Sequence, residues 1–256
     1  MGLFSLTQEL AIDLGTANTL IIYNGKVVVD EPSIVALDVH TGKLVAIGQQ
    51  ARQMHEKTNP NIKTIRPLKD GVIADFNATE LMLRGMIKKV KTSGSLFAPS
   101  LRMVICIPSG STNVEIRAVR DSAEHAGGRE VYMIYEPMAA ALGAGLDVEA
   151  PEGNMVIDIG GGTSEMAVLS MNGVVTSCSV RTAGQKMDEA IVNYIKNEYN
   201  LLIGERTAEE MKMSIGCVFP PEEEMTMEIK GRCLLTGLPK LITVTSTEMM
   251  DAFEEP

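Results

Sequence analysis

Two short stretches of this chain are near copies of each other, and they constrain its fold more than any other feature. Residues 11–19 read AIDLGTANT and residues 156–164 read VIDIGGGTS. Each has an apolar run, an aspartate and a turn of small residues, and the apolar residues after each turn end at an Asn-Gly pair, at residues 24–25 and 172–173. Asn-Gly is the strongest short-range signal for a β-hairpin. The sequence therefore predicts the same hairpin twice.

The residue types in the two turns favour binding of a phosphate group together with a metal ion. Small residues let backbone N–H groups approach an anion closely, and an aspartate at each strand end, Asp13 and Asp158, can hold a hydrated cation. The three glycines at residues 160–162 cost backbone entropy that a plain hairpin does not need to lose. A single Asp-x-Gly turn usually only reverses the chain, so the repetition makes the prediction specific.

A glutamate between the two repeats suits nucleotide hydrolysis. Glu136 follows a predicted strand at residues 131–135 and precedes Pro137, which favours an extended conformation. Open α/β sheets bind ligands at the carboxyl ends of their strands, where a carboxylate can polarise an attacking water. The alternative is an acidic residue that only stabilises the start of a helix.

The order of predicted elements indicates an α/β fold. Residues 103–145 read as strand, helix, strand, helix, which is a parallel crossover pattern. Helices are expected to begin at Asn77 and, with capping boxes, at Thr112 and Thr207. A last helix is expected to begin at residue 247, close to the end of the chain, so we expect the sequence to be a fragment.

Composition excludes some classes of protein. The chain has 256 residues, enough for one large or two medium domains, and no apolar run long enough to span a bilayer. Its net charge of −10 argues against a nucleic-acid-binding surface. The four cysteines have no CxxC spacing, so we expect buried free thiols in a reducing cytoplasm.

The motifs resemble those of the actin, sugar-kinase and heat-shock chaperone superfamily. Residues 11–19 resemble its phosphate-1 motif, residues 135–141 (YEPMAAA) its first connecting motif and residues 157–165 its phosphate-2 motif. Within the superfamily, three further stretches are similar to the bacterial actin-like rod-shape proteins: residues 30–36 (DEPSIVA), 203–209 (IGERTAE) and 236–239 (TGLP).

The resemblance implies an actin-like α/β fold. Two ribonuclease-H-like halves would surround a nucleotide cleft, each half would carry a small inserted subdomain, and the second half would be incomplete. The implied core of the first half is residues 1–30 and 75–140, with residues 31–74 inserted. The implied core of the second half is residues 141–182 and 246–256, with residues 183–245 as its small subdomain.

The resemblance also implies an ATPase that forms filaments. Such a protein binds and hydrolyses ATP with Mg²⁺, governs rod cell shape and organises cell-wall synthesis; the sequence leaves ATP and GTP open. Its implied partners are further copies of itself, the inner membrane surface and the cell-wall elongation machinery, with no nucleic acid. Its implied location is the cytoplasm, peripheral at the inner face of the cell membrane.

Site residues carry over from the resemblance one by one. Asp13 and Asp158 would hold Mg²⁺ largely through water and contact the nucleotide, while Glu136 and Thr163 would position the hydrolytic water. The other implied nucleotide contacts are Gly15, Thr16, Ala17, Asn18, Gly160, Gly161, Gly162, Thr163, Glu209, Glu210, Met211 and Lys212. From spacing alone, Glu209 and Lys212 would be an ordinary surface ion pair on one helix face.

Four apolar residues match the membrane-facing edge of the family: Leu3, Phe4, Leu96 and Phe97. Lysines near Leu96 and Phe97 favour an anionic membrane surface. The alternatives are the start of a strand for the first pair and an anchor into the core for the second.

Three other functions stay open at this point. A chaperone-type ATPase domain shares the phosphate motifs, although its motifs are spaced further apart. A sugar kinase would need a catalytic aspartate near the cleft, for which the sequence offers no convincing candidate. A fragment of the filament protein that binds nucleotide defectively is the third.

Overall fold

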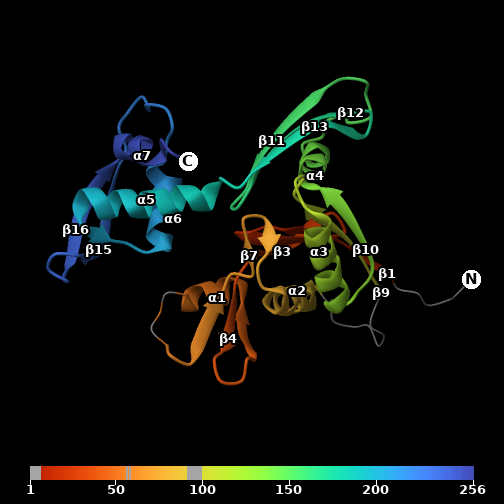
Figure 1. The fold of residues 1–256 in the computed structure, drawn as a ribbon, viewed down its shortest axis with the longest axis horizontal. Coiled ribbons are helices and arrows are strands. Elements are labelled where there is room, and N and C mark those ends of the chain that lie inside the picture. The colour runs from red at the N-terminus through yellow and green to blue at the C-terminus, as the bar shows by residue number, and fades with distance from the viewer. Residues whose placement is uncertain (1–6, 56, 58, 91–99) are drawn as a thin grey trace, which may run out of the picture. The chain divides into compact units, whose positions relative to one another are not determined.

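The computed structural model describes residues 7–55, 57, 59–90 and 100–256 (Figure 1). Its internal contacts divide the chain into two compact units, Met1–Arg181 and Thr182–Pro256. Each unit is described by itself. The sequence predicted two halves, each with a core and a small inserted subdomain. This division into four parts is finer than the two units and stays a prediction.

A mixed five-stranded sheet forms the centre of the first unit. Its order is β10-β9-β1-β2-β3, in which β9 runs parallel to β1 and β10, and β2 runs antiparallel to β1 and β3. The strands are β1 (Thr7–Leu14), β2 (Asn18–Tyr23), β3 (Lys26–Pro32), β9 (Ser100–Ile107) and β10 (Gly128–Tyr135). Asn24 and Gly25 both have positive φ, as the tight turn of a two-residue hairpin requires. The first predicted hairpin is therefore confirmed.

Helices α2 (Phe76–Val90) and α3 (Asn113–His125) pack with this sheet around one core. Alternate residues of β1, including Leu10 and Ile12, are buried in that core with Met82 and Leu83 of α2. The predicted capping box at Thr112 is confirmed. The predicted cap at Asn77 is wrong, because α2 begins one residue earlier and the Asp75 carboxylate accepts the N–H of Ala78 at 2.9 Å.

A smaller three-stranded sheet, β5-β4-β6, is inserted between β3 and α2. The inserted segment consists of β4 (Val35–Asp38), β5 (Leu44–Ile47), α1 (Gly48–Met54) and β6 (Ile62–Ile65), followed by the two-stranded hairpin β7 (Leu68–Lys69) and β8 (Val72–Ile73). Asp70 and Gly71 form the tip of that hairpin, and both have positive φ.

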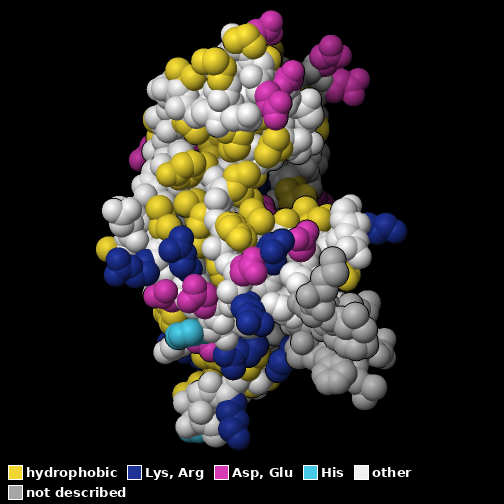
Figure 2. Space-filling view, turned by 90° about the vertical axis from the view of Figure 1, so that its right-hand side faces the viewer, with side chains coloured by type: hydrophobic (Ala, Val, Ile, Leu, Met, Phe, Trp, Pro, Cys, Tyr) yellow, Lys and Arg dark blue, Asp and Glu magenta, His cyan; other side chains and the backbone are white. Residues whose placement is uncertain are grey.

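The second repeat forms a three-stranded antiparallel sheet in the same unit. It contains β11 (Asn154–Ile159), β12 (Ser164–Ser170) and β13 (Gly173–Val180), and α4 (Glu136–Gly143) packs against it. The second predicted hairpin is therefore confirmed, but its turn is formed by Met171 and Asn172, one residue before the predicted Asn172-Gly173 pair. Met155, Ile157 and Ile159 are 63%, 59% and 63% exposed on β11. On the face of the molecule drawn in Figure 2, hydrophobic side chains are concentrated in the upper half.

The second unit has its own core and its own sheet, β14-β15-β16. Its elements are α5 (Gly184–Tyr199), β14 (Leu201–Leu202), α6 (Glu205–Ile215), β15 (Thr226–Cys233), β16 (Pro239–Thr245) and α7 (Ser246–Phe253). Helix α6 begins two residues before Thr207 and has no side-chain cap, so the predicted capping box there is wrong. Helix α7 has a capping box between Thr245 and Glu248.

Candidate functional site

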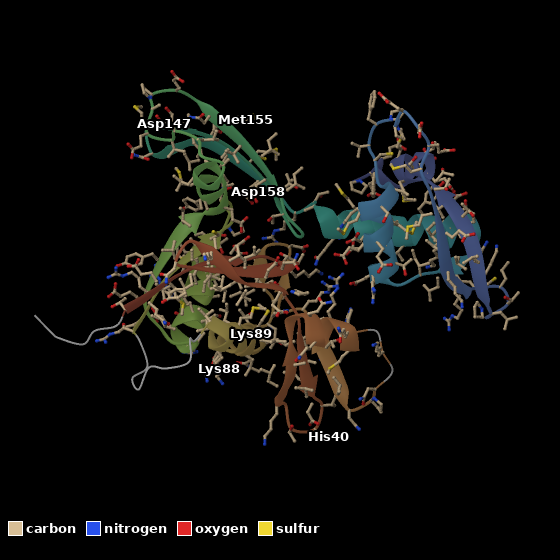
Figure 3. All side chains as sticks on the ribbon, turned by 180° about the vertical axis from the view of Figure 1, so that it is seen from behind. His40, Lys88, Lys89, Asp147, Met155 and Asp158 are labelled. Atoms are coloured by element: carbon tan, nitrogen blue, oxygen red, sulfur yellow. The ribbon has the colours of Figure 1, made fainter. Side chains whose placement is uncertain are left out.

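The two hairpins of the first unit meet at a cavity of about 420 Å³, within the size range of small-molecule sites. Every residue that the sequence predicted in the two turns lines it, together with Glu136. The lining residues are Asp13, Leu14, Gly15, Thr16, Ala17, Asn18, Leu20, Gly71, Cys106, Glu136, Ala139, Ala140, Asp158, Gly160, Gly161, Gly162 and Thr163. Asp158 lies near the end of β11 that adjoins the sheet of the first hairpin (Figure 3).

The glycines of the second turn are required because the first turn lies against them. A Cβ atom on Gly161 would come within 2.5 Å of the Ala17 Cβ, and a Cβ on Gly162 within 2.4 Å of the Thr16 Oγ1. Gly160 N–H donates to the Thr163 carbonyl at 2.9 Å and closes the turn. The two turns thus form one continuous wall of the cavity.

Hydrogen bonds to Ser33 hold the first turn in place. The Ser33 hydroxyl donates to the Gly15 carbonyl at 2.6 Å, and the Ser33 N–H donates to the Ala17 carbonyl at 2.8 Å. The same hydroxyl lies 2.8 Å from the Thr19 Oγ1. Because carbonyl groups of the turn are bound away from the cavity, the turn has a defined conformation before any ligand arrives.

Gly71, at the tip of the β7–β8 hairpin, is a part of the site that the sequence analysis missed. Its N–H donates to the Thr16 Oγ1 at 2.9 Å, and a Cβ atom on it would lie 2.6 Å from the Thr163 Cγ2. The inserted hairpin therefore contacts both turns. Its sequence signal, the Asp70-Gly71 pair, marks a hairpin but does not tell which distant residues that hairpin reaches.

Acidic groups crowd the cavity and shift one another's pKa values. Burial raises the pKa of Glu136 to about 8, and the charges of Asp13, Glu165 and Asp158 act in the same direction. Burial and then Asp158 raise the pKa of Asp13. Burial and then Glu165 raise the pKa of Asp158. The cavity is thus poised to receive positive charge.

Cys106 also lines the cavity, on β9. Burial, followed by the charges of Asp13, Glu136 and Asp158, raises the pKa of its thiol to about 12. Reactivity of a cysteine depends on its thiolate form, so this thiol is inert at neutral pH. All four cysteines are free, as predicted, and Cys178 is exposed rather than buried.

The raised pKa of Glu136 predicts that stability depends on pH. Between the ordinary value of 4.5 and about 8, the folded protein holds a proton that the unfolded chain has lost, so the free energy of unfolding falls as pH rises through this window. At pH values above this window, the nucleotide-free Glu136→Gln variant should therefore be more stable than the wild type by roughly 2–4 kcal/mol. At pH values below the window, the two proteins should have nearly equal free energies of unfolding. Urea unfolding at both ends checks this, and an equal pH dependence in the two proteins would contradict it.

The acidic pair Asp13 and Asp158 fits Mg²⁺ held mainly through water. Among the described residues, no group of three or more His, Cys, Asp or Glu side chains is placed to hold a metal ion directly. Mg²⁺ usually keeps several waters and needs only one or two carboxylates plus phosphate oxygens. The Asp158 charge raises the pKa of Asp13, which is the effect that a nearby cation would reverse.

The residues implied to contact the nucleoside lie in the second unit, on α6. Lys212 Nζ bonds to the Asp188 carboxylate at 2.8 Å and to the Gly184 carbonyl at 3.0 Å. Lys212 is therefore bonded to α5, a contact that its spacing from Glu209 did not predict. Met211 is fully buried in the core of this unit, and Glu210 pairs with Arg206 at 2.9 Å.

Leu3, Phe4, Leu96 and Phe97 lie outside the described residues. In the part of the chain that the structure describes, no helix is both long enough and apolar enough to cross a membrane.

Comparisons with known proteins agree on one family. The model of the MreB/Mbl protein family matches residues 7–256. The cell shape-determining protein Mbl of Bacillus subtilis is 51% identical over 249 residues, which cover 97% of this chain and 74% of that protein. The cell shape-determining protein MreB of Escherichia coli K12 is 51% identical over 260 residues, which cover all of this chain and 74% of that protein.

Solved structures agree on the fold. The crystal structure of MreB5 of Spiroplasma citri bound to AMPPNP has a TM-score of 0.89 and 37% identity, over 97% of this chain and 74% of that one. The MamK double helical filament, at 20% identity, has a TM-score of 0.77 over 95% of this chain and 74% of that one. The predicted actin-like α/β fold is therefore confirmed.

Proposed function

The chain belongs to the MreB/Mbl family, and from this membership we propose that it is a filament-forming ATPase that governs cell shape. The observation that supports the proposal most is the contact between the two turns of small residues, each beside an aspartate that lines the same cavity. Related proteins carry cell-shape names, and MreB5 was crystallised with AMPPNP and with ADP. A nucleotide with at least two phosphates suits a cavity that both turns enclose.

The two turns would bind the phosphates through backbone N–H groups. Glycine and small residues leave these groups accessible, and the bonds from Ser33 and Gly71 hold the first turn in shape. Asp13 and Asp158 would hold Mg²⁺ through water, and bound Mg²⁺ neutralises charge on the transferred phosphoryl group. On α6, Glu209, Glu210 and Lys212 would serve the nucleoside, with Lys212 fixed by Asp188. The Met211 side chain is buried in the core of its own unit, so Met211 would contribute only through its backbone.

Glu136 and Thr163 would position the hydrolytic water. Glu136 lies at the start of α4, directly after β10, and Thr163 lies directly before β12, and both line the cavity. Deprotonated Glu136 would accept a hydrogen bond from the water and orient it toward the terminal phosphate. Phosphoryl transfer depends mostly on positioning and on charge stabilisation, so one oriented carboxylate is enough to matter.

Filament formation would place this activity at the inner face of the cell membrane. The MamK filament supports self-association within the fold. Partners would be further copies of the chain, the membrane surface and the cell-wall elongation machinery, with the protein peripheral to the membrane from the cytoplasmic side. ATP is the proposed nucleotide, and GTP is the alternative.

Polymerisation tests the proposed function. Purified protein should scatter more light after addition of Mg-ATP above a critical concentration, and should release phosphate without any added sugar. Addition of EDTA should abolish both signals, which tests the dependence on Mg²⁺. Absence of polymer at every concentration, with ATP and with GTP, would overturn the filament proposal.

Membrane attachment is tested separately with liposomes. If Leu96 and Phe97 contact the bilayer, the Leu96→Ser/Phe97→Ser double variant should float with anionic liposomes less than the wild type does, because two apolar groups no longer insert. The Leu3→Ser/Phe4→Ser variant tests the first pair in the same way. Flotation of both variants at the wild-type level would remove these residues from the anchor.

A further inference from the structure

Glu165 is a buried acidic residue next to the proposed active site, and none of the roles above uses it. It is only 1% exposed, and it is absent from the residues that line the cavity. A buried carboxylate is costly unless hydrogen bonds satisfy it. Its contacts therefore indicate what holds it there.

Both oxygens of the Glu165 carboxylate bind hydroxyl or backbone groups from other elements. The Ser109 N–H donates to Oε2 at 3.0 Å, and the Ser109 hydroxyl donates to the same oxygen. The Ser179 hydroxyl, on β13, donates to Oε1. Strand β9 belongs to the sheet of the first hairpin, and the segment that follows it carries Ser109. Glu165 thus joins this segment to β12 and β13, two strands of the second hairpin's sheet.

The joined segments lie tightly against each other. A Cβ atom on Gly110 would come within 3.2 Å of the Ser179 Cβ, so the segment after β9 approaches β13 as closely as a glycine allows. The bonds of Glu165 lie at a packed junction and not at a loose surface contact.

The register of the strands places this junction between the two residues proposed to hold the hydrolytic water. In the parallel pair β9–β10, Ile107 lies opposite Tyr135, so Glu136 comes next at the same sheet edge as Ser109. On the other side, Glu165 follows Thr163 by two residues and lies opposite Asp158 in the β11–β12 pair. The bonds of Glu165 therefore connect the segment after β9, which neighbours the end of β10 that precedes Glu136, to the start of β12, which follows Thr163.

We propose that Glu165 is a positioning residue for hydrolysis, which fixes Thr163 relative to Glu136 and thereby the place of the attacking water. This inference rests on the proposed ATPase function. Since Glu165 does not line the cavity, it is not placed to contact the nucleotide itself. Its loss should slow the chemical step and leave binding nearly unchanged, because small displacements of reacting groups can cost about 10²-fold in rate.

The test compares Glu165→Ala with the conservative Glu165→Gln. A glutamine has the same shape, and its amide can accept from Ser109 and donate to Ser179, so it should restore most of the rate. We expect Glu165→Ala to lower the single-turnover rate of ATP hydrolysis about 10- to 100-fold with an ATP dissociation constant within about threefold of the wild type. Glu149→Gln, at an exposed acidic residue of the same unit, is the matched control and should behave as the wild type.

A second measurement reads the connection without nucleotide. The Ser109 amide should exchange its hydrogen faster in Glu165→Ala than in the wild type, and Glu165→Gln should restore the slow exchange. If Glu165→Ala does not fold, the milder Ser179→Ala variant can replace it, because it removes only one of the three bonds. It should also lower the rate of hydrolysis and leave ATP affinity unchanged, with a smaller loss of rate.

Three outcomes would overturn the inference. Hydrolysis at the wild-type rate in a folded Glu165→Ala or Ser179→Ala protein would show that the junction does not position the water. Slower hydrolysis in Glu165→Ala with unchanged hydrogen exchange at the Ser109 amide would mean that loss of the junction is not what slows the reaction. A wild-type protein that binds ATP but never releases phosphate would overturn the proposed ATPase function and this inference together, whereas the first two leave the ATPase function standing.

Discussion

Replacing Glu136 with alanine should slow ATP hydrolysis on the order of 10²-fold or more while nucleotide binding persists. The carboxylate lies at the carboxyl end of β10 and lines the cavity, where no other acidic residue is proposed to orient the water. Asp13 and Asp158 are engaged by the metal in this proposal, so they cannot substitute for it. Single-turnover hydrolysis under saturating Mg-ATP, with binding measured separately, gives the two quantities.

The pH profile distinguishes loss of a base from loss of packing. In the wild type, the rate should rise with pH as Glu136 loses its proton, because its pKa is raised toward 8. That rise should vanish in Glu136→Ala and in Glu136→Gln alike. Glu149→Ala, which removes an exposed carboxylate, should keep both the rate and the profile. Unchanged turnover in Glu136→Ala would exclude Glu136 from the mechanism.

Gly162→Ala should weaken nucleotide binding by roughly 1–3 kcal/mol, or about five- to 150-fold. The added methyl group would meet Thr16 Oγ1 at 2.4 Å and Gly71 N at 2.9 Å, and these atoms hydrogen-bond to each other. Relief of the clash must move the two turns or the β7–β8 hairpin apart, and the phosphates are proposed to lie between those turns. Titration with a fluorescent ATP analogue measures the change.

A glycine outside the cavity provides the control for this variant. Gly153 has its nearest neighbour, Val168 Cγ1, at 3.5 Å from a built Cβ, which is ordinary contact. Gly153→Ala should therefore bind nucleotide as the wild type does. Equal affinities in Gly162→Ala and the wild type would mean that the turns do not enclose the phosphates.

Features coded by neighbouring residues could be predicted from the sequence. The first hairpin follows from an apolar run and its Asn24-Gly25 turn, whereas the second turns at Met171 and Asn172, one residue before the Asn-Gly pair. The capping box at Thr112 follows from a spacing of three residues. The prediction of a helix start failed where two nearby residues could both cap the helix. Asp75 and Asn77 are both good caps, and the Asp75 carboxylate is the group that accepts the N–H of Ala78. At α6 the helix begins after Gly204, which Thr207 did not reveal.

Features that depend on distant contacts could not be read from the sequence. Gly71 is 55 residues from Thr16, and Glu165 is 56 residues from Ser109. A glutamate that follows a phosphate turn has the same local sequence whether it faces solvent or a buried serine. The residues of the two turns that line the cavity could therefore be named from the sequence, whereas the hairpin that completes its wall and the bonds that join its two sides required the fold.

Crowding of acidic groups at the cavity also links nucleotide binding to the uptake and release of protons. With a pKa near 8, Glu136 keeps a proton at neutral pH while the cavity is free of nucleotide. A divalent cation near Asp13 and Asp158 favours the ionised form of neighbouring carboxyl groups, whereas phosphate oxygens favour the protonated form. Formation of the complex therefore changes the number of bound protons, and the heat of binding includes the ionisation heat of the buffer. Affinities for this cavity are comparable only at a stated pH.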